Sequence, residues 1–170
     1  CGGCHDEIYN QWKGSVHNLS LADKIYIEAA LDGLKGLKDK DEIKEAELCQ
    51  KCHTPVGFIT GYPEKTSDSI KKIPELATKG IQCDYCHSIT GAKKIFNAMY
   101  KYSPGKGEED PGVKRGPFKD SVSDYHKSDY SKLHTKSKFC GTCHDVKHVA
   151  FGTWLETTYQ EWVKSPYEKE

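Results

Sequence analysis

Eight cysteines constrain this chain of 170 residues more than any other feature, because they occur only as four pairs with two residues between the partners. A histidine follows each pair directly. The four segments are Cys1–His5, Cys49–His53, Cys83–His87 and Cys140–His144, and no cysteine lies outside them. A disulfide framework does not explain why histidine stands in the same place each time.

The repeated pattern is C-x-x-C-H, the attachment motif of c-type haem. Two thiols form thioethers with the two vinyl groups of one porphyrin, and the next residue then reaches the iron from one face. We therefore predict four haem c groups as cofactors. Their thioethers are assigned to Cys1, Cys4, Cys49, Cys52, Cys83, Cys86, Cys140 and Cys143, and their proximal iron ligands to His5, His53, His87 and His144.

An alternative is a pair of four-cysteine zinc sites, one built from the first two cysteine pairs and one from the last two. It accounts for the pairs but leaves the four histidines as coincidence, so haem is the favoured interpretation.

The histidines outside the motifs are His17, His126, His134 and His148. Four six-coordinate irons need four distal ligands, so the count allows bis-histidine ligation at every haem. Met99, the only methionine, suffices for at most one iron, and Tyr167 is not needed. We predict the four histidines as distal ligands, with their haem partners unassigned.

The spacing of His144 and His148 bears on this pairing. If that stretch is helical, both side chains project from one face of the helix. They would then not reach one iron from opposite sides, and His148 would ligate a different haem.

The composition is polar for a chain that must fold. Only 36% of the residues are hydrophobic and the mean hydropathy is −0.74, which is poor for a self-supporting apolar core of this length. No apolar run approaches the ~18 residues of a membrane span. The 25 basic and 25 acidic side chains balance, so a nucleic-acid surface is not indicated.

Local patterns predict short helices and coil. Helices are expected after a capping pair formed by Ser20 and Asp23, with a stripe of Leu21, Ile25 and Leu31 and an end at Gly33 and Gly36. Further helices are expected over 39–48, 74–79 and 153–164, the last behind a capping box of Thr153 and Glu156, with a loop over 103–119. No segment shows sustained strand alternation. The predicted fold is mainly α with much coil, a single haem-centred domain over 1–170 in which four stacked haems replace a conventional core.

A weak internal repeat follows two of the motifs. Tyr9-x-x-Trp12-x-x-Ser15-x-His17 comes after the first motif, and Tyr159-x-x-Trp162-x-x-Ser165-x-Tyr167 after the fourth. Duplication and convergent packing of aromatic residues against haem both explain it.

With these motifs the chain resembles the multihaem c-type cytochromes over nearly its whole length. It looks similar to the group that includes the tetrahaem electron acceptor of hydroxylamine oxidoreductase, and to the tetrahaem subunits of extracellular cytochrome filaments. The filament resemblance implies a continuous chain of haems through a polymer, with one distal histidine donated by the neighbouring subunit. His17 and His148 are the candidates, because they lie nearest the ends of the chain. The acceptor of hydroxylamine oxidoreductase differs in having one haem without a distal protein ligand, whereas here the histidines suffice for all four.

These features favour electron transfer over catalysis, because bis-histidine iron leaves no position for a substrate. The favoured function is that of a subunit of an extracellular electron-conducting filament, and the alternative is a soluble periplasmic tetrahaem carrier. A multihaem reductase or oxidase of small nitrogen or sulfur compounds would need one open haem. The expected partners are redox proteins and further copies of the chain, without nucleic acid or a transmembrane segment. Thioether formation outside the cytoplasm predicts an exported, extracellular or periplasmic protein.

Overall fold

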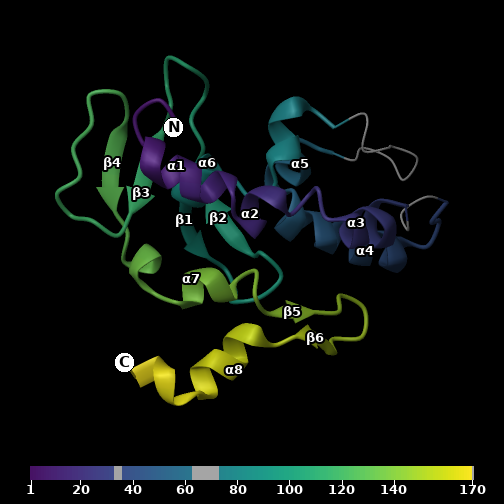
Figure 1. The fold of residues 1–170 in the computed structure, drawn as a ribbon. Coiled ribbons are helices and arrows are strands. Elements are labelled where there is room, and N and C mark those ends of the chain that lie inside the picture. Colours follow the sequence, from purple (N-terminus) through teal and green to yellow (C-terminus); the bar gives the residue numbers. More distant parts are fainter. Residues whose placement is uncertain (33–35, 63–72, 170) are drawn as a thin grey trace. The chain divides into compact units, whose positions relative to one another are not determined.

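The computed structural model describes residues 1–32, 36–62 and 73–169 (Figure 1). Contacts group the chain into two compact units, Cys1–Cys83 and Asp84–Glu170, which are described separately below. A single domain over residues 1–170 stays a prediction, and the expected helix end at Gly33 lies outside the described residues.

The first unit is helical. Its elements are α1 (Asp6–Lys13), α2 (Val16–Leu19), α3 (Lys24–Tyr26) continued by the π-helix η1 (Ile27–Asp32), α4 (Lys40–His53), α5 (Pro55–Ile59) and the 3-10 helix η3 (Glu75–Lys79). Among the described residues, its buried apolar cluster consists of Leu21, Tyr26, Tyr62, Ile73 and Ala77. Such a cluster is small for a unit of this size, as the polar composition predicted.

Helix α4 begins where the sequence indicated. The Asp39 carboxylate accepts the backbone N–H groups of Asp41 and Glu42, as an N-cap residue does. The helix continues past the predicted end through the second motif to His53, so the motif inherits the geometry of a long helix. The predicted helix over 74–79 is present as a 3-10 helix that Gly80 ends.

The predicted helix after residue 20 differs in its cap and its apolar stripe. Asp23, not Ser20, caps α3 by accepting from Ile25 and Tyr26. Tyr26 is buried with Leu21, whereas Ile25 is 80% exposed. The sequence pattern placed Ile25 in the buried stripe, but Tyr26, one position further along, provides the buried contact.

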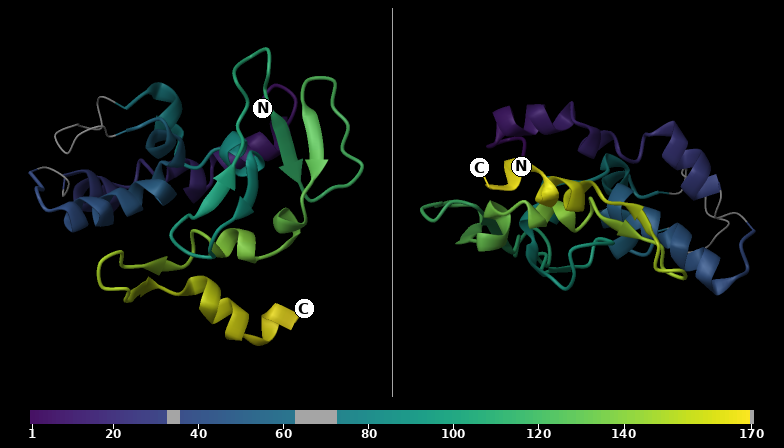
Figure 2. Two further views of the ribbon diagram at one scale, coloured as in Figure 1. Left: turned by 180° about the vertical axis from the view of Figure 1, so that it is seen from behind. Right: turned by 90° about the horizontal axis from the view of Figure 1, so that it is seen from below.

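The second unit combines short helices with three two-stranded sheets (Figure 2). The helices are α6 (Cys83–His87, across the unit boundary), η4 (Lys132–Thr135), α7 (Lys138–Gly141), α8 (Thr158–Lys164) and η5 (Pro166–Lys169). The strands are β1 (Ile89–Ala92), β2 (Tyr100–Tyr102), β3 (Val113–Gly116), β4 (Lys127–Tyr130), β5 (Val146–Lys147) and β6 (Trp154–Glu156). β1–β2 and β5–β6 are antiparallel, and β3–β4 is parallel.

The strands correct two local sequence predictions. β3 lies inside the predicted loop over 103–119, and β6 occupies the start of the predicted helix over 153–164. Helix α8 begins only at Thr158, where the buried Asp145 carboxylate accepts the N–H groups of Tyr159 and Gln160. Strands of two to four residues are too short to display alternation, which is why the pattern missed them. The fold is therefore mixed, with more helix than strand.

No helix in the described parts of the chain is both long and apolar enough to cross a membrane.

Candidate haem-attachment sites

All four C-x-x-C-H segments form one helical turn. The second lies in α4 and the third in α6. In the first, the N–H groups of Cys4 and His5 donate to the carbonyl of Cys1, at 3.1 and 2.9 Å. In the fourth, Cys143 and His144 donate to the Cys140 carbonyl, both at 3.0 Å. Residues i, i+3 and i+4 share one face of a helical turn, so both thiols and the imidazole face the same side, as haem attachment requires.

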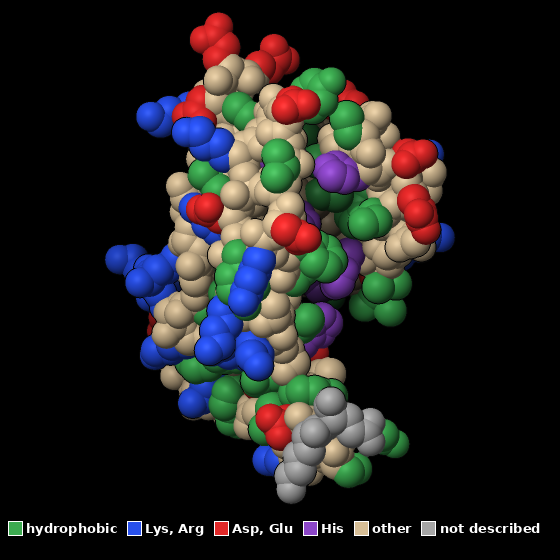
Figure 3. Space-filling view, turned by 90° about the vertical axis from the view of Figure 1, so that its left-hand side faces the viewer, with side chains coloured by type: hydrophobic (Ala, Val, Ile, Leu, Met, Phe, Trp, Pro, Cys, Tyr) green, Lys and Arg blue, Asp and Glu red, His purple; other side chains and the backbone are tan. Residues whose placement is uncertain are grey.

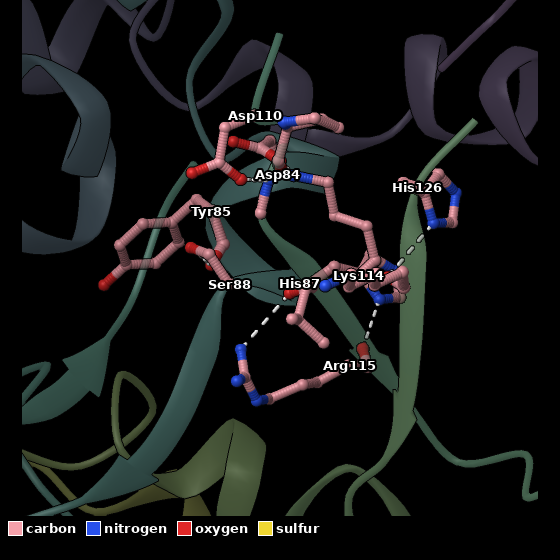
Figure 4. A network of polar contacts seen from close by, with 12 residues as sticks. Asp84, Tyr85, His87, Ser88, Asp110, Lys114, Arg115 and His126 are labelled. Carbon is pink, nitrogen blue, oxygen red and sulfur yellow. Dashed lines mark hydrogen bonds and ion pairs between the residues drawn. The ribbon is translucent and has the colours of Figure 1, made fainter. Parts of the chain in front are cut away.

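The other ring nitrogen of three proximal histidines faces an acceptor. His53 Nδ1 lies 3.1 Å from the Ser20 carbonyl oxygen, and His87 Nδ1 lies 2.6 Å from that of Arg115 in β3 (Figure 4). His144 Nδ1 lies 3.7 Å from the Glu156 carboxylate. A metal-bound histidine donates the N–H of its other ring nitrogen to such a group. This bond fixes the tautomer and leaves Nε2 for the metal. The residues present thus fit haem iron.

The second motif is held from two sides. The Ser20 hydroxyl donates to the His53 carbonyl at 2.8 Å while the Ser20 carbonyl accepts from His53 Nδ1, so the two residues are joined twice. The Tyr26 ring stacks on His53, with 4.3 Å between centroids and 4° between planes. Burial raises the pKa of Tyr26 well above its usual value.

The third motif is anchored by the β3–β4 sheet. Lys114 of β3 pairs with Asp84 inside the motif, and the neighbouring Arg115 supplies the carbonyl to His87 (Figure 4). His126 directly precedes β4, the partner of β3, and its Nδ1 lies 3.4 Å from Ser128 Oγ. One small sheet therefore carries a proximal-ligand partner and a distal-ligand candidate.

The internal repeat corresponds to a repeated local structure. A Cβ added at Gly2 would lie 2.8 Å from the Tyr9 ring, and one at Gly141 would lie 2.3 Å from the Tyr159 ring. Each tyrosine also donates its N–H to the proximal histidine of its motif, His5 or His144. Each of the two attachment turns thus has a tyrosine ring packed on the glycine that follows its first cysteine.

The repeat continues through tryptophan and serine. Ser15 Oγ donates to the Trp12 carbonyl at 2.7 Å, and Ser165 Oγ to that of Trp162 at 2.6 Å. The first copy then presents His17 in α2, where Ile81 donates to the His17 carbonyl at 2.9 Å. The second copy presents Tyr167 in η5.

Exposed apolar side chains lie close in sequence to three of the predicted distal ligands. Val16, Val122 and Phe151 are each more than three-quarters exposed, and they lie within four residues of His17, His126 and His148 respectively. Figure 3 shows one face on which histidine side chains lie at the surface beside hydrophobic ones.

His148 lies in the turn between β5 and β6, so the stretch from His144 to His148 is not helical and the condition for a shared helix face is not met. His148 Nδ1 accepts the N–H groups of Ala150 and Phe151, at 3.2 and 3.3 Å. An accepting Nδ1 leaves the proton of the neutral ring on Nε2. Iron ligation through Nε2 would require this turn to give up both bonds.

A row of aromatic rings near the third and fourth motifs was not predicted from the sequence. Tyr85, Tyr100, Phe139, His134 and His87 follow one another with centroid distances of 6.2, 5.6, 4.5 and 6.0 Å. His134 Nε2 donates to the Cys86 carbonyl at 3.0 Å, and its Nδ1 is buried without a hydrogen-bond partner. Burial lowers the pKa of His134, which favours the neutral ring that a metal ligand needs.

A loop in a left-handed conformation braces the fourth motif. Asn97 and Ala98 have φ of 56° and 51°. Their N–H groups donate to the carbonyls of Asp145 and Thr142, at 3.0 and 2.7 Å. The Asn97 side chain also exchanges two hydrogen bonds with the Lys147 backbone, at 2.8 and 2.7 Å.

Replacing Asn97 with alanine is expected to reduce the free energy of unfolding by about 2–3 kcal/mol, because two hydrogen bonds are lost and alanine disfavours positive φ. Asn97→Gly loses the same bonds but tolerates the backbone, so it should be less destabilised. Urea midpoints of both variants measure the difference. Equal midpoints would show that backbone strain contributes nothing here.

The zinc alternative finds no support in the side-chain arrangement. Across residues 1–32, 36–62 and 73–169, no three His, Cys, Asp or Glu side chains gather as a metal site requires. No disulfide joins any of the eight cysteines, all of which are described.

Comparison with known proteins decides the family. A profile of cytochrome c554 and c-prime matches residues 1–88, slightly more than half of the chain. The chain belongs to the cytochrome c554 and c-prime family. This cytochrome is also similar in structure to a penta-heme cytochrome c552 from Thermochromatium tepidum, with a TM-score of 0.62 and 24% identity. That likeness concerns the fold; it covers 98% of this chain and 50% of the other. No curated protein matches the chain.

The family confirms the coarser sequence prediction. The chain is a multihaem c-type cytochrome with haem c as its cofactor. The cytochrome spans only about half the length of the solved structure it matches, so the activity of any larger protein is a matter for proposal. The resemblance to filament subunits and to the acceptor of hydroxylamine oxidoreductase stays a prediction.

Proposed function

We propose that this cytochrome carries four haem c groups and passes electrons through them. The observation that supports this most directly is the equivalent helical turn at all four motifs, with the Nδ1 atoms of His53 and His87 already engaged by carbonyls. Haem iron supplies one-electron chemistry between its ferric and ferrous states. The chain contributes the thioether anchors, the axial imidazoles and their orientation.

The distal ligands in this proposal are His17, His126, His134 and His148, one for each haem. Four saturated irons make the protein an electron carrier, because no coordination position remains for a substrate. We further propose that it is exported and assembles with its own copies into an extracellular filament. A soluble periplasmic carrier that serves redox partner proteins is the alternative within the same class.

One observation favours a second candidate. His148 Nδ1 already accepts two backbone N–H groups, so iron ligation through its Nε2 would require both hydrogen bonds to be lost. If His148 is not a ligand, one haem has an open position, and reduction or oxidation of a small nitrogen or sulfur compound becomes feasible.

Three measurements on the holoprotein test the proposal. Mass spectrometry should show four covalent haems, and fewer than four would contradict it. Electron paramagnetic resonance should show only low-spin ferric haem, whereas a stoichiometric high-spin signal in the intact assembly would favour the enzyme. Electron microscopy of native material should show ordered filaments, and discrete monomers would leave the soluble carrier instead.

Replacing His17 with alanine is expected to convert one of four haems from low-spin to high-spin, because its iron loses a distal ligand. His17→Met retains a ligand, so it should stay low-spin and raise the potential of the same haem. Electron paramagnetic resonance of both variants measures this. A fully low-spin His17→Ala protein that still forms normal assemblies would remove His17 from the ligand set.

A further inference from the structure

The partners of the proximal histidines differ in charge. His53 and His87 face neutral backbone carbonyls through Nδ1, whereas His144 faces the Glu156 carboxylate at 3.7 Å. That distance is longer than a hydrogen bond but within ion-pair range. Among the Nδ1 contacts described at these three proximal histidines, this is the one with a charged partner.

Both members of this pair are held by the fold. Glu156 lies in β6 opposite Val146 of β5, two residues after His144. The Thr158 hydroxyl donates to Glu156 Oε1 at 3.0 Å. The His144 backbone is fixed by bonds to the Cys140 carbonyl and from the Tyr159 N–H, both at 3.0 Å. The short β5–β6 sheet therefore brings the carboxylate to the imidazole.

A carboxylate beside an axial imidazole acts on the iron in one direction. A fixed negative charge stabilises the ferric state, which carries one more positive charge than the ferrous state. A carboxylate partner also raises the basicity of the ligand, which again favours ferric iron. Both effects lower the reduction potential, while the partial exposure of the two side chains, 48% and 42%, weakens them through solvent screening.

We propose that Glu156 lowers the reduction potential of the haem attached through Cys140 and Cys143 below the potentials of the two haems ligated by His53 and His87. This rests on the proposed function, because it requires His144 to ligate iron. Glu156 is a positioning and tuning residue: it touches the ligand, not the haem. Its effect gives the haem chain a preferred direction, since electrons pass from this haem to the two haems of higher potential.

Glu161 provides a matched control. Its Oε1 accepts a threonine hydroxyl, that of Thr157, at 2.8 Å, and it lies in the neighbouring helix α8. Glu161→Gln removes the same charge and perturbs a similar threonine contact, five residues further along the chain. Glu156→Asp keeps the charge on a shorter side chain and tests whether the carboxylate itself is responsible.

The test is a redox titration of each holoprotein, resolved into four one-electron components. Glu156→Gln is expected to change the ferric-to-ferrous ratio of one haem about tenfold at fixed potential, an upward shift of ~59 mV. That component should be the lowest or next to lowest of the four in the wild type, and Glu156→Asp should shift it less. The low-spin electron paramagnetic resonance signal of the same haem should also change in Glu156→Gln. Glu161→Gln should leave the potentials of all four components unchanged.

Equal shifts in Glu156→Gln and Glu161→Gln, or no shift in either, would overturn the inference. Mass spectrometry on the same samples separates this from a failure of the proposed function. If Glu156→Gln retains four haems and no potential shifts, only the role of Glu156 is contradicted. A wild-type protein with fewer than four haems contradicts the proposed function and the inference that depends on it.

Discussion

A variant with serine at both Cys49 and Cys52 is expected to carry three covalent haems and to lose the folded structure of residues 1–83. The described buried apolar cluster of this unit has five members, and one of them, Tyr26, stacks on the proximal His53. A porphyrin attached at the second motif would complete this core. Its loss is expected to cost more than about 5 kcal/mol, comparable to the whole stability of a small domain.

Mass spectrometry of the variant counts the haems, and circular dichroism against urea follows the loss of helix in the whole protein. Lys51→Ala is the control, because Lys51 lies between the two cysteines and its contact in the described part of the chain is a cation–π contact with Phe58, at 5.1 Å. It should retain four haems and shift the midpoint little. A three-haem double variant with an unchanged midpoint would show that the protein core suffices without this porphyrin.

Replacing Gly80 with alanine is expected to destabilise the protein by about 3–5 kcal/mol. Gly80 has φ of 57° and ψ of −130°, a conformation essentially confined to glycine. An added Cβ would lie 2.4 Å from Ser20 Oγ and 2.5 Å from the His17 carbonyl oxygen. Relief would require the backbone of α2 to move, which costs packing energy in addition to the backbone strain.

The same substitution should disturb the haems. α2 carries His17, and Ser20 just beyond it holds His53 through two hydrogen bonds. Displacing this segment is expected to produce high-spin ferric haem, measured by electron paramagnetic resonance alongside the urea midpoint.

Gly61→Ala is the control that separates backbone strain from contact with the α2 segment. Gly61 also has positive φ, at 86°, but an added Cβ would meet nothing within 4 Å among residues 1–32, 36–62 and 73–169. Gly61→Ala should therefore cost only about 1–2 kcal/mol and leave the haem spectrum unchanged. Equal effects at Gly61 and Gly80 would show that backbone strain alone, and not contact with α2, accounts for the loss.

The sequence by itself determined the attachment chemistry. Thioether formation and proximal ligation involve residues at i, i+3 and i+4, so a linear motif contains the whole geometry of the turn. The start of α4 was also local, because Asp39 caps N–H groups only two and three residues away. These short-range features alone predict covalently attached haem c.

Only the tertiary structure decided which groups surround each proximal histidine. The Ser20 carbonyl, the Arg115 carbonyl and the Glu156 carboxylate come from 33, 28 and 12 residues away, measured along the chain from His53, His87 and His144. Pairings over such separations depend on loop paths and strand register, which leave no periodic trace in strands of two to four residues. The sequence therefore predicts where the haems attach, whereas the fold decides how the predicted proximal ligands are oriented and which charges lie beside them.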